Sequence, residues 1–172
     1  MLCHPLSPRN PDLVLVDTRV IANAPMEFFI AGVSDALAPW LEAKAVAATF
    51  SNTIASDLPT ATGTALARLS RDLLGENPIP AIAAARDYVV TPAFETVVEA
   101  NTPLSGLGFE SGGLAAAHAI HSGLTAAPQT HGFQHGCKVK VGSVTQLAFE
   151  GAPLAETRAL SSSLPALVYR TA

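Results

Sequence analysis

The sequence has 172 residues, enough for about one domain, with a net charge of −4 and 14% charged residues. Because soluble domains typically have about 25% charged residues, we expect part of this surface to be buried, against a missing domain or in a homo-oligomer. The acidic balance without a basic stripe excludes nucleic acid as a partner. Cys3 and Cys137 form no disulfide framework, which favours the cytoplasm. The start lacks the pattern of a signal peptide, and no apolar run reaches the ~18–20 residues of a membrane helix.

The first element in chain order is an unbroken run of Leu and Val at 13–16, bounded by Pro11 and Asp17. Such a run is typical of a strand buried on both faces of a parallel sheet. No partner strand follows it, and an unpaired strand leaves its backbone groups without hydrogen bonds. Either another chain supplies the sheet, or the sheet lies N-terminal to Met1; we favour the second.

The rest of the chain predicts an all-α fold with helices separated by Gly and Pro breaks. The expected ranges are 26–30, 36–48, 60–74, 79–90, 92–102, 106–124 and 135–151, and 154–172 is weakly patterned. Ser34 is the expected N-cap of the second helix, with Asp35 in its first turn, where the helix dipole favours a carboxylate. Pro39 would crowd the Asp35 carbonyl inside a regular helix, so the helix starts at Asp35 or is kinked there.

Four of the five histidines fall between residues 104 and 142, the stretch with the strongest chemical signal. His118 and His121 are three residues apart and share one face of a helix. His135 follows a loop that contains Pro128 and opens a second apolar run. A helix with one His, a turn and a second His can bring two imidazoles to one metal, with a third ligand from elsewhere. The alternatives are a hydrogen-bonded core residue for His118 and a helix-start residue for His135.

Four ordered blocks carry a resemblance that covers residues 10–153: PDLVLVDT, AGVSDALAPWLEAKA, VVEANTPLSGLGFESGGLAAAHAIHSGLTA and HGCKVKVGSVTQL. The chain resembles glycerol dehydrogenases, in the superfamily of metal-dependent polyol and iron-type alcohol dehydrogenases. That resemblance implies a dehydroquinate synthase-like fold, in which an α/β dinucleotide-binding domain precedes an all-helical metal-binding domain and the cleft between them holds the alcohol. Residues 1–20 would then be the last strand of the first domain. Residues 21–172 would be the helical domain, truncated at its C-terminal end.

Transferred by position, the resemblance places the metal on Asp35, His118 and His135. One carboxylate and two neutral imidazoles suit Zn²⁺, and three protein ligands leave a position open for a substrate oxygen. Iron-type relatives have a further His where this sequence has Pro39, so the resemblance favours zinc over iron. Without the resemblance, Asp35 would be interpreted as an ordinary acid at a helix N-terminus.

The resemblance also implies roles for side chains around the metal. His121 lies where the family places a His near the nicotinamide, which makes it a candidate catalytic residue or a cleft-lining one. Phe109 is expected to line the substrate cleft. Cys137, which replaces a usual acidic residue, is a packed small residue or, as an alternative, a thiolate ligand. His131 is expected in a loop, and His4 at a frayed terminus.

The implied function is NAD-dependent, zinc-assisted oxidation of glycerol or a related small polyol, in which the hydride passes to nicotinamide. No Gly-rich phosphate turn follows a strand in this sequence, so we assign no NAD-binding residues and expect the chain alone to be inactive. The alternatives are a non-catalytic helical metal-binding module or a truncated pseudoenzyme. The sequence motif SGLGFESGGLAAAH disfavours a related phosphate-eliminating synthase.

Overall fold

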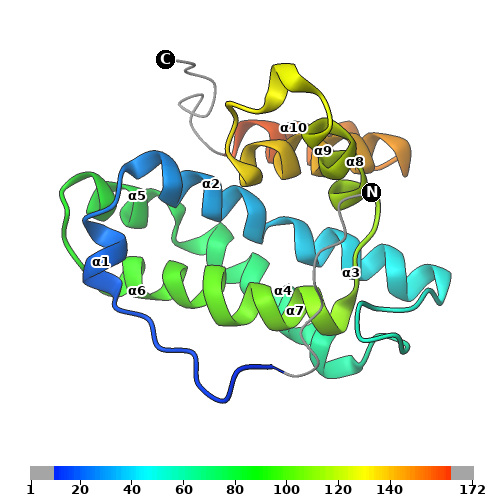
Figure 1. Ribbon diagram of the computed structural model, residues 1–172, viewed down its shortest axis with the longest axis horizontal. Helices are drawn as coiled ribbons and strands as arrows, with labels where there is room; N and C mark the ends of the chain where they lie inside the picture. Colours follow the sequence, from blue (N-terminus) through cyan, green and yellow to red (C-terminus); the bar gives the residue numbers. More distant parts are fainter. Residues whose placement is uncertain (1–9, 164–172) are drawn as a thin grey trace.

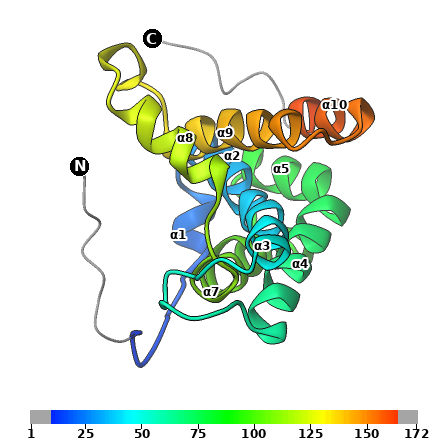
Figure 2. The same cartoon turned by 90° about the vertical axis from the view of Figure 1, so that its right-hand side faces the viewer.

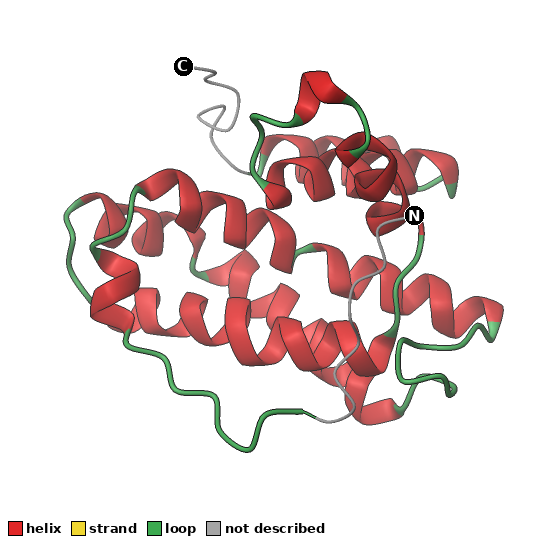
Figure 3. Cartoon of the chain, in the orientation of Figure 1, coloured by secondary structure: helices red, strands yellow, loops and turns green. Residues whose placement is uncertain are grey.

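The computed structural model describes residues 10–163, and this part of the chain is all-α, without a strand (Figures 1 and 3). The predicted all-α class is therefore confirmed. The helices are α1 (Thr18–Ala22), α2 (Met26–Ala36), α3 (Ala38–Thr49), α4 (Ala61–Glu76), α5 (Pro78–Arg86), α6 (Pro92–Glu99), the π-helical turn η1 (Ala100–Leu104), α7 (Ser105–Gly112), α8 (Ala116–Thr125), the 3₁₀ turn η2 (Pro128–Thr130), α9 (His135–Phe149) and α10 (Leu154–Ser162). None of the described helices is long and apolar enough to cross a membrane.

The consecutive helices α2 and α3 form the middle layer of the fold. On one side they contact the rod made by α6, η1 and α7, with α4 and α5 packed alongside; on the other side lie α8, α9 and α10 (Figures 1 and 2). The end of α2, η1, α7, α8 and the start of α9 therefore surround one common space. This arrangement positions the candidate site.

The main hydrophobic core lies between α2, α4, α5 and α6. Its centre is the stacked pair Phe29 and Phe94, whose ring centroids are 4.9 Å apart, and both rings are buried. A second, smaller cluster joins α3, α8 and α9 through Ala38, Ala117 and Val139, each fully buried. Because Ala117 precedes His118, this second cluster fixes the helix that carries that histidine.

The predicted strand at 13–16 is wrong. These residues lie in an irregular segment before α1, and Leu13 and Leu15 are 75% and 87% exposed. A strand needs a neighbour for its backbone hydrogen bonds, and the described part of the chain offers none. Asp17 instead caps the short helix α1, which the sequence analysis did not predict, because its Oδ1 accepts the N–H of Arg19 at 2.9 Å.

The predicted N-cap at Ser34 is also wrong. Helix α2 continues through Gly32 to Ala36, and the buried Ser34 hydroxyl donates to the Ile30 carbonyl at 2.8 Å inside the helix. Asp35 therefore lies in the last turn of α2, not in a first turn. The helix break falls at Leu37, and Pro39 occupies the first turn of α3, where its missing N–H is tolerated.

The predicted helix 106–124 is divided into α7 and α8. The break is at Gly113, whose φ of +94° suits glycine, and a Cβ there would lie 2.9 Å from Val46 Cγ1. In the other direction α7 is continuous with α6, because η1 accommodates Pro103 in a wider turn. The division lets α8 turn away from α7 and join α9 on the far side of α3.

Candidate metal centre

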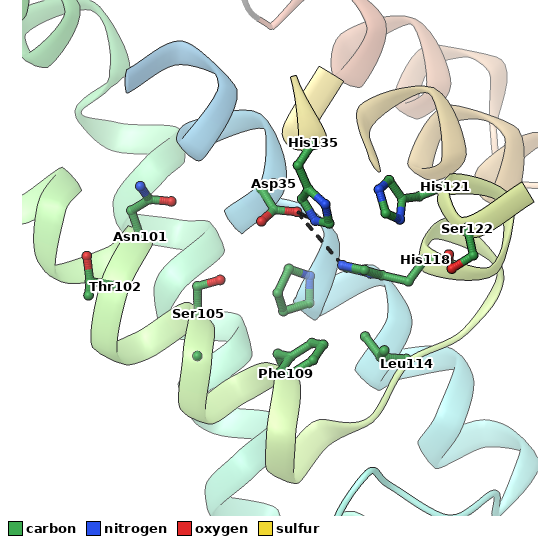
Figure 4. Close-up of a pocket in the computed structure, with 12 residues that line it drawn as sticks. Asp35, Asn101, Thr102, Ser105, Phe109, Leu114, His118, His121, Ser122 and His135 are labelled. Carbon is green, nitrogen blue, oxygen red and sulfur yellow. Dashed lines mark hydrogen bonds and ion pairs between the residues drawn. The ribbon is translucent and has the colours of Figure 1, made fainter. Parts of the chain in front are cut away.

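Three side chains from three helices meet at one point. Asp35 lies in the last turn of α2, His118 lies on α8 and His135 is the first residue of α9. Asp35 Oδ1 lies 3.3 Å from His135 Nε2 and 3.8 Å from His118 Nε2 (Figure 4). One ligand atom from each of the three lies within 4.8 Å of the others, and residues 10–163 contain no second such group. The structure thus brings together the three residues that the sequence analysis selected, and their ligand role stays a prediction.

A buried oxygen without a hydrogen bond tests whether this group fits a metal. Asp35 Oδ1 is buried and makes no hydrogen bond, although two imidazole nitrogens lie near it. Leaving a buried acceptor unpaired costs about 1–3 kcal/mol. A divalent cation shared by the carboxylate and the two nitrogens would remove that penalty, and one carboxylate with two imidazoles is a donor set that zinc accepts. The residues present therefore fit a bound metal.

Two glycines of α9 allow the three helices to come this close. A Cβ on Gly136 would lie 1.8 Å from the Ala31 carbonyl oxygen of α2, and a Cβ on Gly142 would lie 2.2 Å from the Ala117 carbonyl oxygen of α8. Any larger residue would separate α9 from one of its neighbours. The glycine next to His135 is thus a packing requirement of the site.

Glu42 is the residue of this site that the sequence analysis missed. Its side chain is fully buried in α3, and its Oε2 lies 2.6 Å from His118 Nδ1. Its Oε1 accepts the backbone N–H groups of Ala115 and His118, both at 2.9 Å. One sequence signal could have indicated Glu42 as part of the site. It is an acid in an Ala-rich run, seven residues after Asp35, which is a spacing of about two helical turns.

The two neighbouring carboxylates change the electrostatics of His118. Burial by itself lowers the pKa of this imidazole, but its hydrogen bond to the Glu42 carboxylate and the negative charges of Glu42 and Asp35 outweigh the effect of burial. The net result is a His118 pKa above its ordinary value. The same negative charges favour a cation at the Nε2 side of the ring.

His121 lies beside the three candidate ligands and is not one of them. Its Nε2 is 3.2 Å from the Thr125 hydroxyl, and its ring centroid is 4.1 Å from that of His135. Burial, and then repulsion from His135 and His118, lowers its pKa to about 4. His121 is therefore neutral at physiological pH, able to line the cleft or to accept a proton.

The group opens into a cavity of about 430 Å³. Phe109 lies in its wall beside Leu114, with its ring centroid 5.8 Å from that of His118 (Figure 4), and Pro39 also lines the cavity. The wall opposite the imidazoles carries polar side chains from η1 and α7: Asn101, Thr102 and Ser105. A small molecule with several hydroxyl groups would find hydrogen-bonding partners there and an apolar floor.

Among the described residues, Cys137 and His131 are not part of this group. Cys137 is buried, and burial raises the pKa of its thiol, which disfavours the thiolate form that binds metals. His131 is exposed in the turn after η2, with its Nε2 3.2 Å from the Thr125 carbonyl oxygen. His4 and Cys3 lie outside the described residues.

Comparison with known proteins shows which proteins the chain is similar to. Glycerol dehydrogenase from Escherichia coli O6:H1 is 50% identical over 157 residues, which are 91% of this chain and 43% of that protein. Glycerol dehydrogenase from Pseudomonas putida is 51% identical over 155 residues, 90% of this chain and 42% of that protein. The crystal structure of glycerol dehydrogenase from Schizosaccharomyces pombe matches with a TM-score of 0.87 at 45% identity, and covers 90% of this chain and 40% of that one.

The chain is thus similar to glycerol dehydrogenases over about nine tenths of its own length. Its helices match the C-terminal helical domain of the glycerol dehydrogenase structures. The chain spans about two fifths of the length of the curated glycerol dehydrogenases that it matches. No protein-family model matches the sequence.

Proposed function

We propose that this chain forms the metal- and alcohol-binding part of an NAD-dependent glycerol dehydrogenase, with Asp35, His118 and His135 as the zinc ligands. The observation that carries the proposal is the buried Oδ1 of Asp35, which makes no hydrogen bond and lies near two imidazole nitrogens. A carboxylate in this position is unfavourable without a cation and favourable with one. The substrate class is glycerol or a related small polyol, after the relatives' names.

The surroundings of the group favour zinc over iron. Pro39 is buried in the wall of the cavity that Asp35 also lines, in the position where the resemblance implies a further histidine ligand in iron-type enzymes. Its ring has no donor atom. Three protein ligands with an open position are the arrangement of catalytic zinc sites.

Bound zinc would supply a Lewis acid that polarises the substrate hydroxyl. The chain's own residues do the rest of the binding. Phe109 and Leu114 exclude water from one side of the cavity, and the polar wall on η1 can hydrogen-bond the remaining hydroxyls of a polyol. His121, neutral and beside His135, is the candidate catalytic residue within reach of a proton released in the cavity.

We expect NAD to be bound mainly by residues outside 10–163. The described cavity has no Gly-rich turn at a helix N-terminus to hold a pyrophosphate. In this proposal residues 1–20 end a dinucleotide-binding domain, and 21–172 form the helical domain. The exposed apolar residues at 13–15 support burial against such a domain or in a homo-oligomer. The use of only two cysteines supports a cytoplasmic location.

Zinc content is the first test. The purified chain should bind about one Zn²⁺, and His118→Ala should abolish this binding, because two ligands rarely hold zinc against a buffer. His131→Ala is the matched control, since that histidine is exposed outside the group. Plasma emission spectrometry on the three proteins measures the result. Equal zinc in wild type and His118→Ala would remove the site.

NADH absorbance with glycerol, zinc and NAD is the second test. We expect no turnover by the 172-residue chain alone, because positioning the nicotinamide accounts for about 7–11 kcal/mol of such a barrier. Addition of a separately made N-terminal half of a full-length glycerol dehydrogenase should restore some turnover. Steady turnover by the chain alone, lost in His118→Ala, would contradict our account of how NAD is held.

A second candidate function is a metal-binding helical module without redox activity. The observation that favours it is the coverage of about two fifths of each relative. Zinc binding combined with no turnover, even after complementation, would support this alternative.

A further inference from the structure

We propose that Glu42 is the positioning residue of the metal centre: it fixes His118 with the ring proton on Nδ1, so that the Nε2 lone pair faces Asp35. The inference rests on the proposed function, because it gives His118 a ligand role. It adds a residue from a fourth helix, α3, and Glu42 itself does not line the cavity.

The geometry of the Glu42 carboxylate determines which nitrogen of the His118 ring carries the proton. Its Oε1 accepts two backbone N–H groups, from Ala115 and His118, and these two donors hold the carboxylate in place. Its Oε2 then lies 2.6 Å from His118 Nδ1. A carboxylate oxygen only accepts, so Nδ1 must donate, and the proton of the neutral ring is excluded from Nε2. Nε2 is the nitrogen 3.8 Å from Asp35 Oδ1.

A purely structural role as a helix cap does not account for all three contacts. Helix α8 has no side-chain cap of its own, and the first-turn N–H of Ala117 is accepted by Gln146 Oε1 at 2.9 Å. The neutral amide of Gln146 thus already serves as a cap on this turn. A carboxylate at position 42, fully buried, is needed only for the third contact, the one to the imidazole.

The test variant is Glu42→Gln, which preserves the shape of the side chain. The two backbone donors should hold the amide oxygen in the place of Oε1, so that the NH₂ group faces His118 Nδ1. Nδ1 must then accept, and the ring proton moves to Nε2, where it blocks metal binding. Nitrogen-15 NMR of the histidine rings at alkaline pH should show the Nδ1–H form in the metal-free wild type and the Nε2–H form in the variant. Zinc affinity should fall about 10–100-fold.

Gln146→Met is the matched control, because it removes a cap from the same turn of α8 without touching His118. It should lower stability and leave both the tautomer and the zinc affinity unchanged. Glu42→Asp should retain part of the affinity that Glu42→Gln loses.

Three outcomes would overturn the inference: an Nε2–H ring in the wild type, wild-type zinc affinity in Glu42→Gln, or equal loss of affinity in Gln146→Met. The wild-type spectrum decides the question even if Glu42→Gln does not fold. If the wild-type chain takes up no zinc, the proposed function fails, and the tautomer measurement still tests Glu42.

Discussion

Replacing Asp35 by Asn should have opposite effects on stability with and without zinc. In the metal-free chain, Asp35 Oδ1 is buried without a hydrogen bond, 3.3 Å from His135 Nε2. An unpaired buried acceptor costs about 1–3 kcal/mol. An Asn amide can donate to that neutral nitrogen and removes the charge. We therefore expect metal-free Asp35→Asn to be about 1 kcal/mol more stable than wild type at alkaline pH, a rise in Tm of about 2–4 °C.

With zinc the order should reverse. At a free zinc concentration of about 100 times Kd, binding stabilises the native state by about 2.7 kcal/mol. For a domain of this size, that raises the wild-type Tm by about 5–11 °C. Asp35→Asn has lost the only charged ligand, so its Tm should change little at the same zinc concentration.

Thermal unfolding followed by circular dichroism, with chelator or with zinc, measures both effects. Asp72→Asn is the matched control, because Asp72 is a surface acid paired with Arg68 at 3.6 Å, remote from the site. It should follow the wild type to within about 1 kcal/mol in both conditions. Two results together would refute the role of Asp35 as a residue held in place for a cation. Metal-free Asp35→Asn would be less stable than wild type, and zinc would raise its Tm as much as it raises that of the wild type.

Four further predictions concern packing, the π turn, protons and association. Gly136→Ala should lower the free energy of unfolding by about 2 kcal/mol in urea, because its Cβ would meet the Ala31 carbonyl, whereas Gly123→Ala, with open space around it, should not lower it. Ser70→Ala should cost about 1 kcal/mol in the same assay, since the buried hydroxyl donates to the Ala100 carbonyl of η1 at 2.9 Å. Zinc affinity, measured against a chelator over a pH series, should decrease as the pH falls, because protons compete for the two imidazoles. Sedimentation at several concentrations should show self-association through the exposed apolar run before α1; a monomer throughout would contradict it.

Local signals in the sequence were sufficient for most of the helices. The breaks at Gly and Pro predicted α4, α5 and α9 to within a few residues, because these residues disfavour the continuation of a helix through their own backbone properties. The same reasoning failed at Ser34, which has the residue type of an N-cap but is buried inside α2. Ser34 is satisfied by the Ile30 carbonyl of its own helix, and nothing in the local pattern distinguishes that bond from a cap.

The candidate ligands were selected by resemblance and by the spacing of His118, His121 and His135, and this information is contained in the sequence. What only the tertiary structure decided is how they are held. Glu42 reaches its backbone donors across 73 and 76 residues of chain, and no periodicity connects positions so far apart. The strand expected at 13–16 failed for the same reason, because a strand exists only where another strand lies beside it. Helical hydrogen bonds are local and can be read from short windows, whereas a buried carboxylate and its partners come together only when the helices pack.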